Sequence, residues 1–208
     1  MTRAYHARMD GIGWAAGAMN AARTRLDVAA ENLANGSTDG FRKSDLRGFL
    51  TASGIVMQRS RSTAAGPLRH TGRPFDLAIA GPGTFRVRDT AGHVTATRDG
   101  AFTRDRFGRL VDDSGRVLMG TRGPLCVPEG AVIDSSGTLT RNGVVLNRIA
   151  VPAGSTVRTG FLESSNVDAI GEMIDVLTAQ RSFETAQKVL SAIDQTRERA
   201  STQVAQLK

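Results

Sequence analysis

The sequence predicts an α+β fold, in which an all-β body of short antiparallel strands, of sandwich or barrel type, is flanked by a long helix at each end. Apolar residues recur at helical spacing near both ends of the chain. In the middle they alternate with polar residues in short runs that glycine-containing turns separate. The 208 residues, of which 40% are hydrophobic, are enough for one such core.

Residues 1–41 are predicted to form an N-terminal helical arm that ends in a turn. Its apolar residues follow one another at steps of three or four, which places them on one stripe of a helix; the stripe contains Met19, Ala22, Leu26, Ala29 and Leu33. This face is narrow and rich in alanine, so it requires a partner. We therefore expect it to be an assembly interface with the helix at the other end of the chain.

The turn after this helix is predicted from Asn35-Gly36 and Asp39-Gly40, because Asn and Gly tolerate the left-handed backbone that ends a helix. The turn motif comprises Asn32, Asn35, Ser37, Thr38, Gly40 and Phe41. Residues 42–66 follow as a basic connector, with a possible short strand at Ile55 to Met57. Seven basic residues and one acid lie between Phe41 and Arg73. Such a segment is either a solvated connector or a contact for a polyanion.

Residues 67–160 are predicted to form the β domain, since the apolar period changes from helical to two after Pro67. Short strands are expected at 76–81, 84–88, 93–97, 101–103, 110–111, 117–119, 131–133, 138–140, 144–151 and 155–159. Between them stand turn residues such as Asp99-Gly100 and Ser114-Gly115. Strands of this length and spacing are typical of an all-β body.

Residues 161–208 are predicted to form a C-terminal helical arm, with one long helix over residues 167–199. Its apolar and polar stripe suits a coiled coil with the N-terminal helix, in which Gln and Asp set the register. The expected interface residues on this arm are Met173, Val176, Leu177, Gln180, Phe183, Ala186, Leu190 and Ile193.

No residue pattern indicates catalysis, a cofactor or a metal site. The single cysteine, Cys126, excludes an intramolecular disulfide and is expected to be a small buried hydrophobe. The aspartates of the β domain do not have calcium-loop spacing and are expected to serve turns. No apolar run is long enough for a membrane span, and the first 20 residues lack the apolar core of a cleavable signal.

Four runs of residues resemble signatures of the bacterial flagellar rod and hook proteins. The first is Glu-Asn-Leu-Ala-Asn-x-Ser-Thr-x-Gly-Phe-Arg, which ends at Arg42. The second is Asp-Leu-Ala-Ile-x-Gly-x-Gly-x-Phe-x-Val from Asp76, and the third is Thr-Arg-Asp-Gly-Ala-Phe from Thr97. The fourth combines residues 160–168 with Ala-Gln-Arg-Ser-Phe-Glu from Ala179. Gly36, Asp39, Thr84 and Ala96 depart from the family pattern.

The resemblance, most marked to the shorter rod proteins, implies a structural subunit of the flagellar basal-body rod. Such a subunit would polymerise through its terminal helices into a helical tube, with copies of itself and with other rod and hook proteins. It would leave the cytoplasm through the flagellar export apparatus without a cleaved signal and reach the periplasmic span of the rod. The resemblance implies no nucleic-acid partner and no stable membrane insertion.

The alternative from the residues alone is an Arg-rich module that binds nucleic acid or another polyanion. The formal charge of +7 favours it. The wide spread of the arginines and the absence of an aromatic stacking platform disfavour it. An enzyme is a distant third hypothesis.

Overall fold

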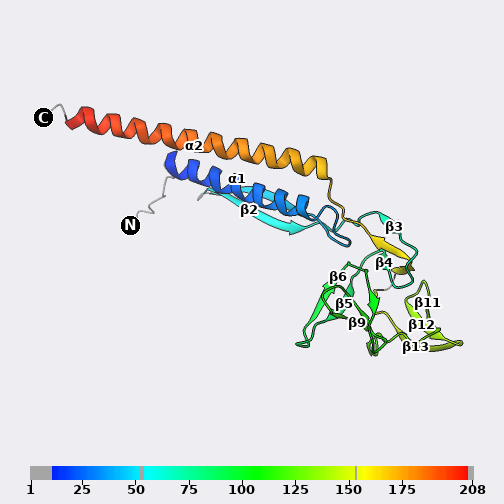
Figure 1. Ribbon diagram of the computed structural model, residues 1–208. Coiled ribbons are helices and arrows are strands. Elements are labelled where there is room, and N and C mark those ends of the chain that lie inside the picture. The colour runs from blue at the N-terminus through cyan, green and yellow to red at the C-terminus, as the bar shows by residue number, and fades with distance from the viewer. Residues whose placement is uncertain (1–10, 52–53, 153, 206–208) are drawn as a thin grey trace. The chain divides into compact units, whose positions relative to one another are not determined.

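The computed structural model describes residues 11–51, 54–152 and 154–205, which divide into two compact units (Figure 1). The helical unit contains the two helices and the first strand pair, from residues up to 34, 43–62 and from 167 onward. The strand unit contains residues 35–42 and 63–166. The expected start of the N-terminal arm, residues 1–10, lies outside the described residues.

Two helices pack against each other in the helical unit, as Figure 1 shows. Helix α1 spans Gly11–Ala34 and helix α2 spans Ala169–Ala205, so α2 continues beyond the expected end at 199. Their directions are antiparallel. A Cβ atom built on Gly11 would lie 3.2 Å from Ile193 Cδ1, while Asn32 and Glu172 line one cavity at the opposite end of the pair.

A β-hairpin accompanies α1 in this unit. Strand β1, Ser44–Thr51, pairs antiparallel with β2, Gly54–Arg61, from Ser44 opposite Arg61 to Thr51 opposite Gly54. Both strands contact α1. The segment that the sequence presented as a basic connector is therefore a hairpin over most of its length, and the possible strand at 55–57 lies within β2.

The strand unit consists of several small antiparallel sheets. Its largest sheet has the order β6-β5-β9-β8-β7, and β10 is added on β9. These strands are β5 Phe85–Arg88, β6 Val94–Thr97, β7 Thr103–Arg104, β8 Leu110–Val111, β9 Val117–Gly120 and β10 Gly123–Pro124. A three-stranded sheet contains β11 Val132–Ile133, β12 Thr138–Arg141 and β13 Val144–Arg148.

Two further strand pairs complete this unit. They are β14 Thr156–Thr159 with β4 Leu77–Ala80, and β15 Phe161–Glu163 with β3 Leu68–His70. The prediction of short antiparallel strands is confirmed. The barrel alternative is wrong, because the strands described for residues 63–166 form separate small sheets that do not close on one another.

One hydrophobic core joins these sheets. It is built from alternating residues of the strands, for example Leu77 with Ile79 and Phe85 with Val87, all of which are buried. The rings of Phe85 and Phe102 meet edge to face, with centroids 5.5 Å apart. The period of two that predicted the strands thus identifies the side chains that fill the core.

Cys126 is exposed, and its expected burial is wrong. The neighbouring residues explain the difference. Leu125 and Val127 are both buried in the core, and successive side chains of extended backbone point to opposite sides. With its two neighbours facing inward, Cys126 faces solvent.

Candidate assembly interface

The shielded residues of α2 form a seam with heptad spacing. Glu172, Ala179 and Ala186 are buried and lie seven residues apart. Partly buried residues alternate with them, so that the whole seam steps by four and three; its members are Glu172, Val176, Ala179, Phe183, Ala186, Leu190 and Ile193. A period of 3.5 residues is typical of helices that pack along their length.

The facing residues of α1 are small. Ala15, Ala22 and Ala29 are buried and again lie seven residues apart, with Ala21 and Val28 beside them. Small side chains allow two helix axes to come close, so the pair gains many weak contacts over a long distance.

The sequence-predicted interface residues fall into three groups. Three alanines are buried: Ala22, Ala29 and Ala186. Seven residues are partly buried in the helical unit: Met19, Leu26, Leu33, Val176, Phe183, Leu190 and Ile193. Three are exposed: Met173, Leu177 and Gln180. The pairing of the two helices therefore uses the first two groups and leaves the third on the surface.

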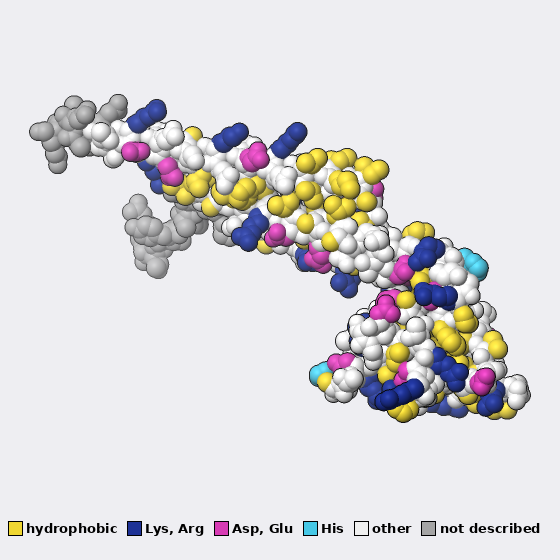
Figure 2. Space-filling view, in the orientation of Figure 1, with side chains coloured by type: hydrophobic (Ala, Val, Ile, Leu, Met, Phe, Trp, Pro, Cys, Tyr) yellow, Lys and Arg dark blue, Asp and Glu magenta, His cyan; other side chains and the backbone are white. Residues whose placement is uncertain are grey.

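An exposed apolar stripe, which we call the outer stripe, covers the first turns of α2 away from its seam. Its side chains are between 52% and 72% exposed and belong to Ile170, Met173, Ile174 and Leu177. Figure 2 shows hydrophobic side chains gathered over the first turns of α2. Sequence periodicity had already marked most of them as apolar. Periodicity alone does not distinguish the residues that face α1 from those that face solvent. The seven-residue spacing of the buried alanines does distinguish them.

The residues of the predicted turn motif have two different roles. Asn32 is buried at the end of α1, where its side-chain amide donates to Ser44 O at 3.0 Å and its Oδ1 accepts from Ser44 N–H at 2.8 Å. It therefore fastens β1 to α1. The turn itself starts at Asn35, whose backbone oxygen accepts from Thr38 N–H, and Phe41 N–H then donates to Thr38 O. Ser37 is exposed, and Phe41 is partly buried.

Gly40 is the position in this turn where only glycine fits. Its φ is +71°, and an added Cβ would lie 2.2 Å from the backbone nitrogen of Asp99. A left-handed backbone conformation alone costs a residue with a side chain about 1–2 kcal/mol. We expect Gly40→Ala to destabilise the strand unit by more than this, because its Cβ would also clash with Asp99. Gly92→Ala is the matched control, because Gly92 has a φ of +92° but no atom near its added Cβ. Denaturant unfolding of both variants measures the difference, and equal losses would contradict the steric argument.

Glu163 occupies the centre of a buried ion cluster in the strand unit. Its side chain is 1% exposed, and its Oε2 accepts from Arg98 Nη1 at 2.7 Å. Its Oε1 accepts from Arg42 Nη2 at 3.1 Å and from Gly66 N–H at 3.2 Å, and its backbone oxygen accepts from Gly40 N–H. Arg98 also donates to the backbone oxygens of Ile79 and Gly81. One carboxylate thus ties together three of the sequence signatures, a role that the sequence did not reveal.

The aspartates of the strand unit serve local turns, as the sequence indicated. Asp105 pairs with Arg109 and Asp112 pairs with Arg116, each at 2.7 Å, and both carboxylates accept backbone N–H groups of their own turns. At Asp134, hydrogen bonds from the Ser136 side chain and from nearby backbone lower the pKa below its usual value.

Asp99 differs from these turn aspartates because burial raises the pKa of its carboxyl, and the negative charges of Asp112, Asp113 and Asp39 add to this effect. Its folded pKa therefore lies above the unfolded value of 3.8. The charged form destabilises the fold at neutral pH, and this penalty disappears as pH falls through the folded pKa.

We expect Asp99→Asn to raise the melting temperature at pH 7, because Asn retains the oxygen that accepts Ala101 N–H and removes the unfavourable charge. The gain should vanish in acid, where Asp99 itself is protonated. Thermal unfolding of both proteins across the acid range measures the effect. A difference that does not depend on pH would contradict it.

Most basic residues between Phe41 and Arg73 are already paired with acids of this chain. Five of the seven form ion pairs: Arg42 with Glu163, Lys43 with Asp45, Arg59 with Glu31, Arg69 with Asp39 and Arg73 with Asp76. These pairs occupy the groups that a polyanion would need. Within the described ranges, no cluster of three or more His, Cys, Asp and Glu is placed to hold a metal ion, and no helix is long and apolar enough to cross a membrane.

A packed pair of helices with an apolar outer stripe and a strand unit whose aspartates mostly serve turns are features of a structural protein. Three family models match the chain. They describe the flagella basal body rod protein at residues 13–42, the flagellar hook protein FlgE/F/G D1 domain at 78–172, and the flagellar basal body rod FlgEFG protein C-terminal region at 158–203.

Curated relatives agree with these models. The flagellar basal-body rod protein FlgF of Escherichia coli K12 is 30% identical, and the match covers 88% of this chain and 95% of the relative. FlgF of Mesorhizobium japonicum is 31% identical over 84% and 89% of the two chains, and FlgG of Bacillus subtilis is 27% identical over 83% and 90%. The chain belongs to the flagellar basal-body rod proteins of the FlgF/FlgG type, a family of structural proteins of the basal body.

Proposed function

We propose that this rod protein polymerises through α1 and α2 into a helical, tubular axial structure, in which its neighbours are copies of itself and other rod and hook proteins. A contact that repeats head to tail without closing into a ring generates such a filament.

The observation that supports this proposal most directly is the outer stripe. The pairing of α1 with α2 leaves Ile170, Met173 and Leu177 more than half exposed. Full burial of a large apolar side chain stabilises an interface by about 1.5–3 kcal/mol relative to leaving it in water. A stripe of four such residues on one helix therefore favours a neighbour that covers it.

We also propose that α1 and α2 pair as a coiled coil. The alternation of three and four along the α2 seam has the required period of 3.5 residues, and the buried alanines of α1 follow it. The phenylalanine and leucine of the seam, Phe183 and Leu190, then insert between the small residues of α1.

For localisation, we propose that the chain leaves the cytoplasm through the flagellar export apparatus without a cleaved signal. It would then be placed in the periplasmic span of the rod. Membership in the rod protein family supports this path.

Electron microscopy of basal bodies tests the proposal. A strain that lacks the chain should yield basal bodies with an incomplete rod, and re-expression of the full chain should restore it. Basal bodies with complete rods in the deletion strain would contradict the proposal.

The Arg-rich polyanion hypothesis has less support. Five of the seven basic residues after Phe41 are held in ion pairs, so few of them are available to phosphates. A DNA-binding assay across a salt series distinguishes the two functions, because phosphate contacts give a steep loss of affinity with salt.

A further inference from the structure

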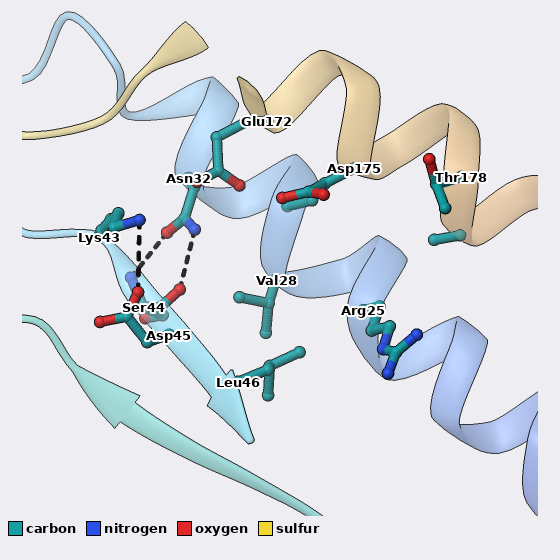
Figure 3. A pocket seen from close by; sticks show the side chains of 12 residues that line it. Arg25, Val28, Asn32, Lys43, Ser44, Asp45, Leu46, Glu172, Asp175 and Thr178 are labelled. Atoms are coloured by element: carbon teal, nitrogen blue, oxygen red, sulfur yellow. Dashed lines mark hydrogen bonds and ion pairs between the residues drawn. The ribbon is translucent and has the colours of Figure 1, made fainter. Parts of the chain in front are cut away.

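A cavity of about 300 Å³ lies in the helical unit between α1, β1 and the first turns of α2 (Figure 3). Its walls include Asn32 and Val28 of α1, Ser44 and Asp45 of β1, and Glu172 and Asp175 of α2. Figure 3 shows the side chains of Glu172 and Asp175 extending from α2 towards α1. The two acids are three residues apart, so they share one face of the helix.

Glu172 is unusual among the charged residues of α2 because only 8% of it is exposed. Its carboxylate makes no hydrogen bond and no ion pair with the part of the chain that the structure describes, and the same is true of Asp175. The other polar residues of the cavity are satisfied: Asp45 pairs with Lys43, and Asn32 bonds to Ser44. Arg25 also lines the cavity, but in Figure 3 its guanidinium lies away from both carboxylates.

The Glu172 side chain is mostly shielded, but its carboxylate oxygens remain accessible to solvent in the cavity and have gained no donor from the described residues. Two neighbouring carboxylates repel each other and attract positive charge, so the pair favours a cationic group. A bare metal ion fits poorly, since the described residues offer no set of three ligating side chains and the cavity is much larger than one ion. A guanidinium fits the two acids better, because its planar fork of five N–H donors can bond both carboxylates at once.

This chain carries suitable guanidinium groups. Three of its 27 basic residues are lysines, which leaves 24 arginines and a net charge of +7. Arg23 and Arg181 are exposed on α1 and α2 and form no ion pair with an acid of the described chain. The cavity also adjoins the outer stripe, because Met173 follows Glu172 and Ile174 precedes Asp175.

We infer that Glu172 and Asp175 form a receptor for an arginine side chain of a second copy of this chain. The inference rests on the proposed function, in which copies pack against the outer stripe. The arginine would enter the cavity when the neighbour covers that stripe. Its guanidinium would bond the Glu172 carboxylate, which has no partner among the residues that the structure describes.

Sedimentation velocity of the purified full-length chain, as a function of concentration and salt, tests the inference. Glu172→Gln should weaken self-association about ten- to a hundredfold at low salt, because one charge-assisted hydrogen bond to a buried acid is lost. Its association should also depend less on salt than that of the unchanged chain. Glu198→Gln is the matched control, since Glu198 is exposed far along α2, and it should associate like the unchanged chain. Circular dichroism verifies that both variants keep their helices.

The outcomes separate this inference from the proposed function. If Leu177→Asp prevents association while Glu172→Gln associates normally, assembly through the outer stripe stands and the arginine receptor is wrong. Association that a chelator abolishes would replace the arginine with a divalent cation. A chain that stays monomeric at every concentration and salt would overturn both, because no second copy then docks.

Discussion

Replacing Leu177 with aspartate is expected to abolish assembly while the chain itself stays folded. Leu177 is 58% exposed and lies outside the seam with α1, so a charge there leaves the helix pair intact. In an assembled wall the same position would be covered by a neighbour. A carboxylate buried in an apolar contact without a partner costs several kcal/mol, which is enough to lose the interface.

Motility and rod formation in a strain that carries only Leu177→Asp measure this effect. Gln195→Asp is the matched control, because Gln195 is exposed on α2 outside the outer stripe. Phe183→Asp provides a contrast. Phe183 belongs to the seam, so its replacement should also reduce the helix content of the purified chain. Normal motility of the Leu177→Asp strain would refute polymerisation through the outer stripe.

Replacing Glu163 with alanine is expected to destabilise the strand unit by about 3–5 kcal/mol, the usual cost of removing one partner from a buried ion pair. The Glu163 carboxylate balances the charge of Arg98, which is itself buried, and that of Arg42. The guanidinium of Arg98 is already incompletely hydrogen-bonded, because its Nε is buried without a partner within the described chain. Without Glu163, its guanidinium would keep only the two backbone oxygens.

Hydrogen exchange of the core strands measures this loss directly and does not require the whole chain to unfold in one step. β4 and β5 should exchange faster in Glu163→Ala. Glu129→Ala is the matched control, since Glu129 is exposed and forms no ion pair with the described residues. Equal protection in the two variants would show that the ion cluster contributes little to stability.

The strands of the body could be predicted from the sequence because burial on one face imposes a period of two. Ten expected strand positions overlap strands of the structure; the strand at 110–111 has the same bounds, and the other nine differ at one end or both. The pair β15 and β3 was missed for a physical reason. Phe161–Glu163 is only three residues long, and Leu68–His70 is exposed throughout, so neither shows alternation.

The hairpin of β1 and β2 was predicted only at residues 55–57, which lie in β2. Most of its residues are exposed and only Ser44 and Gly54 are buried, so burial imposes little alternation on these two strands. Its position depends instead on the two hydrogen bonds between Asn32 and Ser44. Those bonds are visible only after the chain has folded.

The interface on α2 was half predictable. The sequence identified a helix with a wide apolar surface, and Val176, Phe183 and Leu190 do lie in the seam. Met173 and Leu177 were expected in the same stripe and face away from it. A hydrophobicity pattern is dominated by large apolar side chains, whereas the small side chains of Ala179 and Ala186 determine where the two helices can approach each other.

The pairing of α1 with α2 also sets the order in which this molecule can fold. The helices are separated by 134 residues, 35 to 168, so their contact closes one of the longest loops that the chain allows. Contacts of such separation form late, because the entropy of closing the loop is lost before the contact is gained. Most strand pairs of the strand unit join segments that are close in sequence. This unit can therefore fold before α1 packs against α2. The seam between α1 and α2 is therefore expected to close after the strand unit has folded.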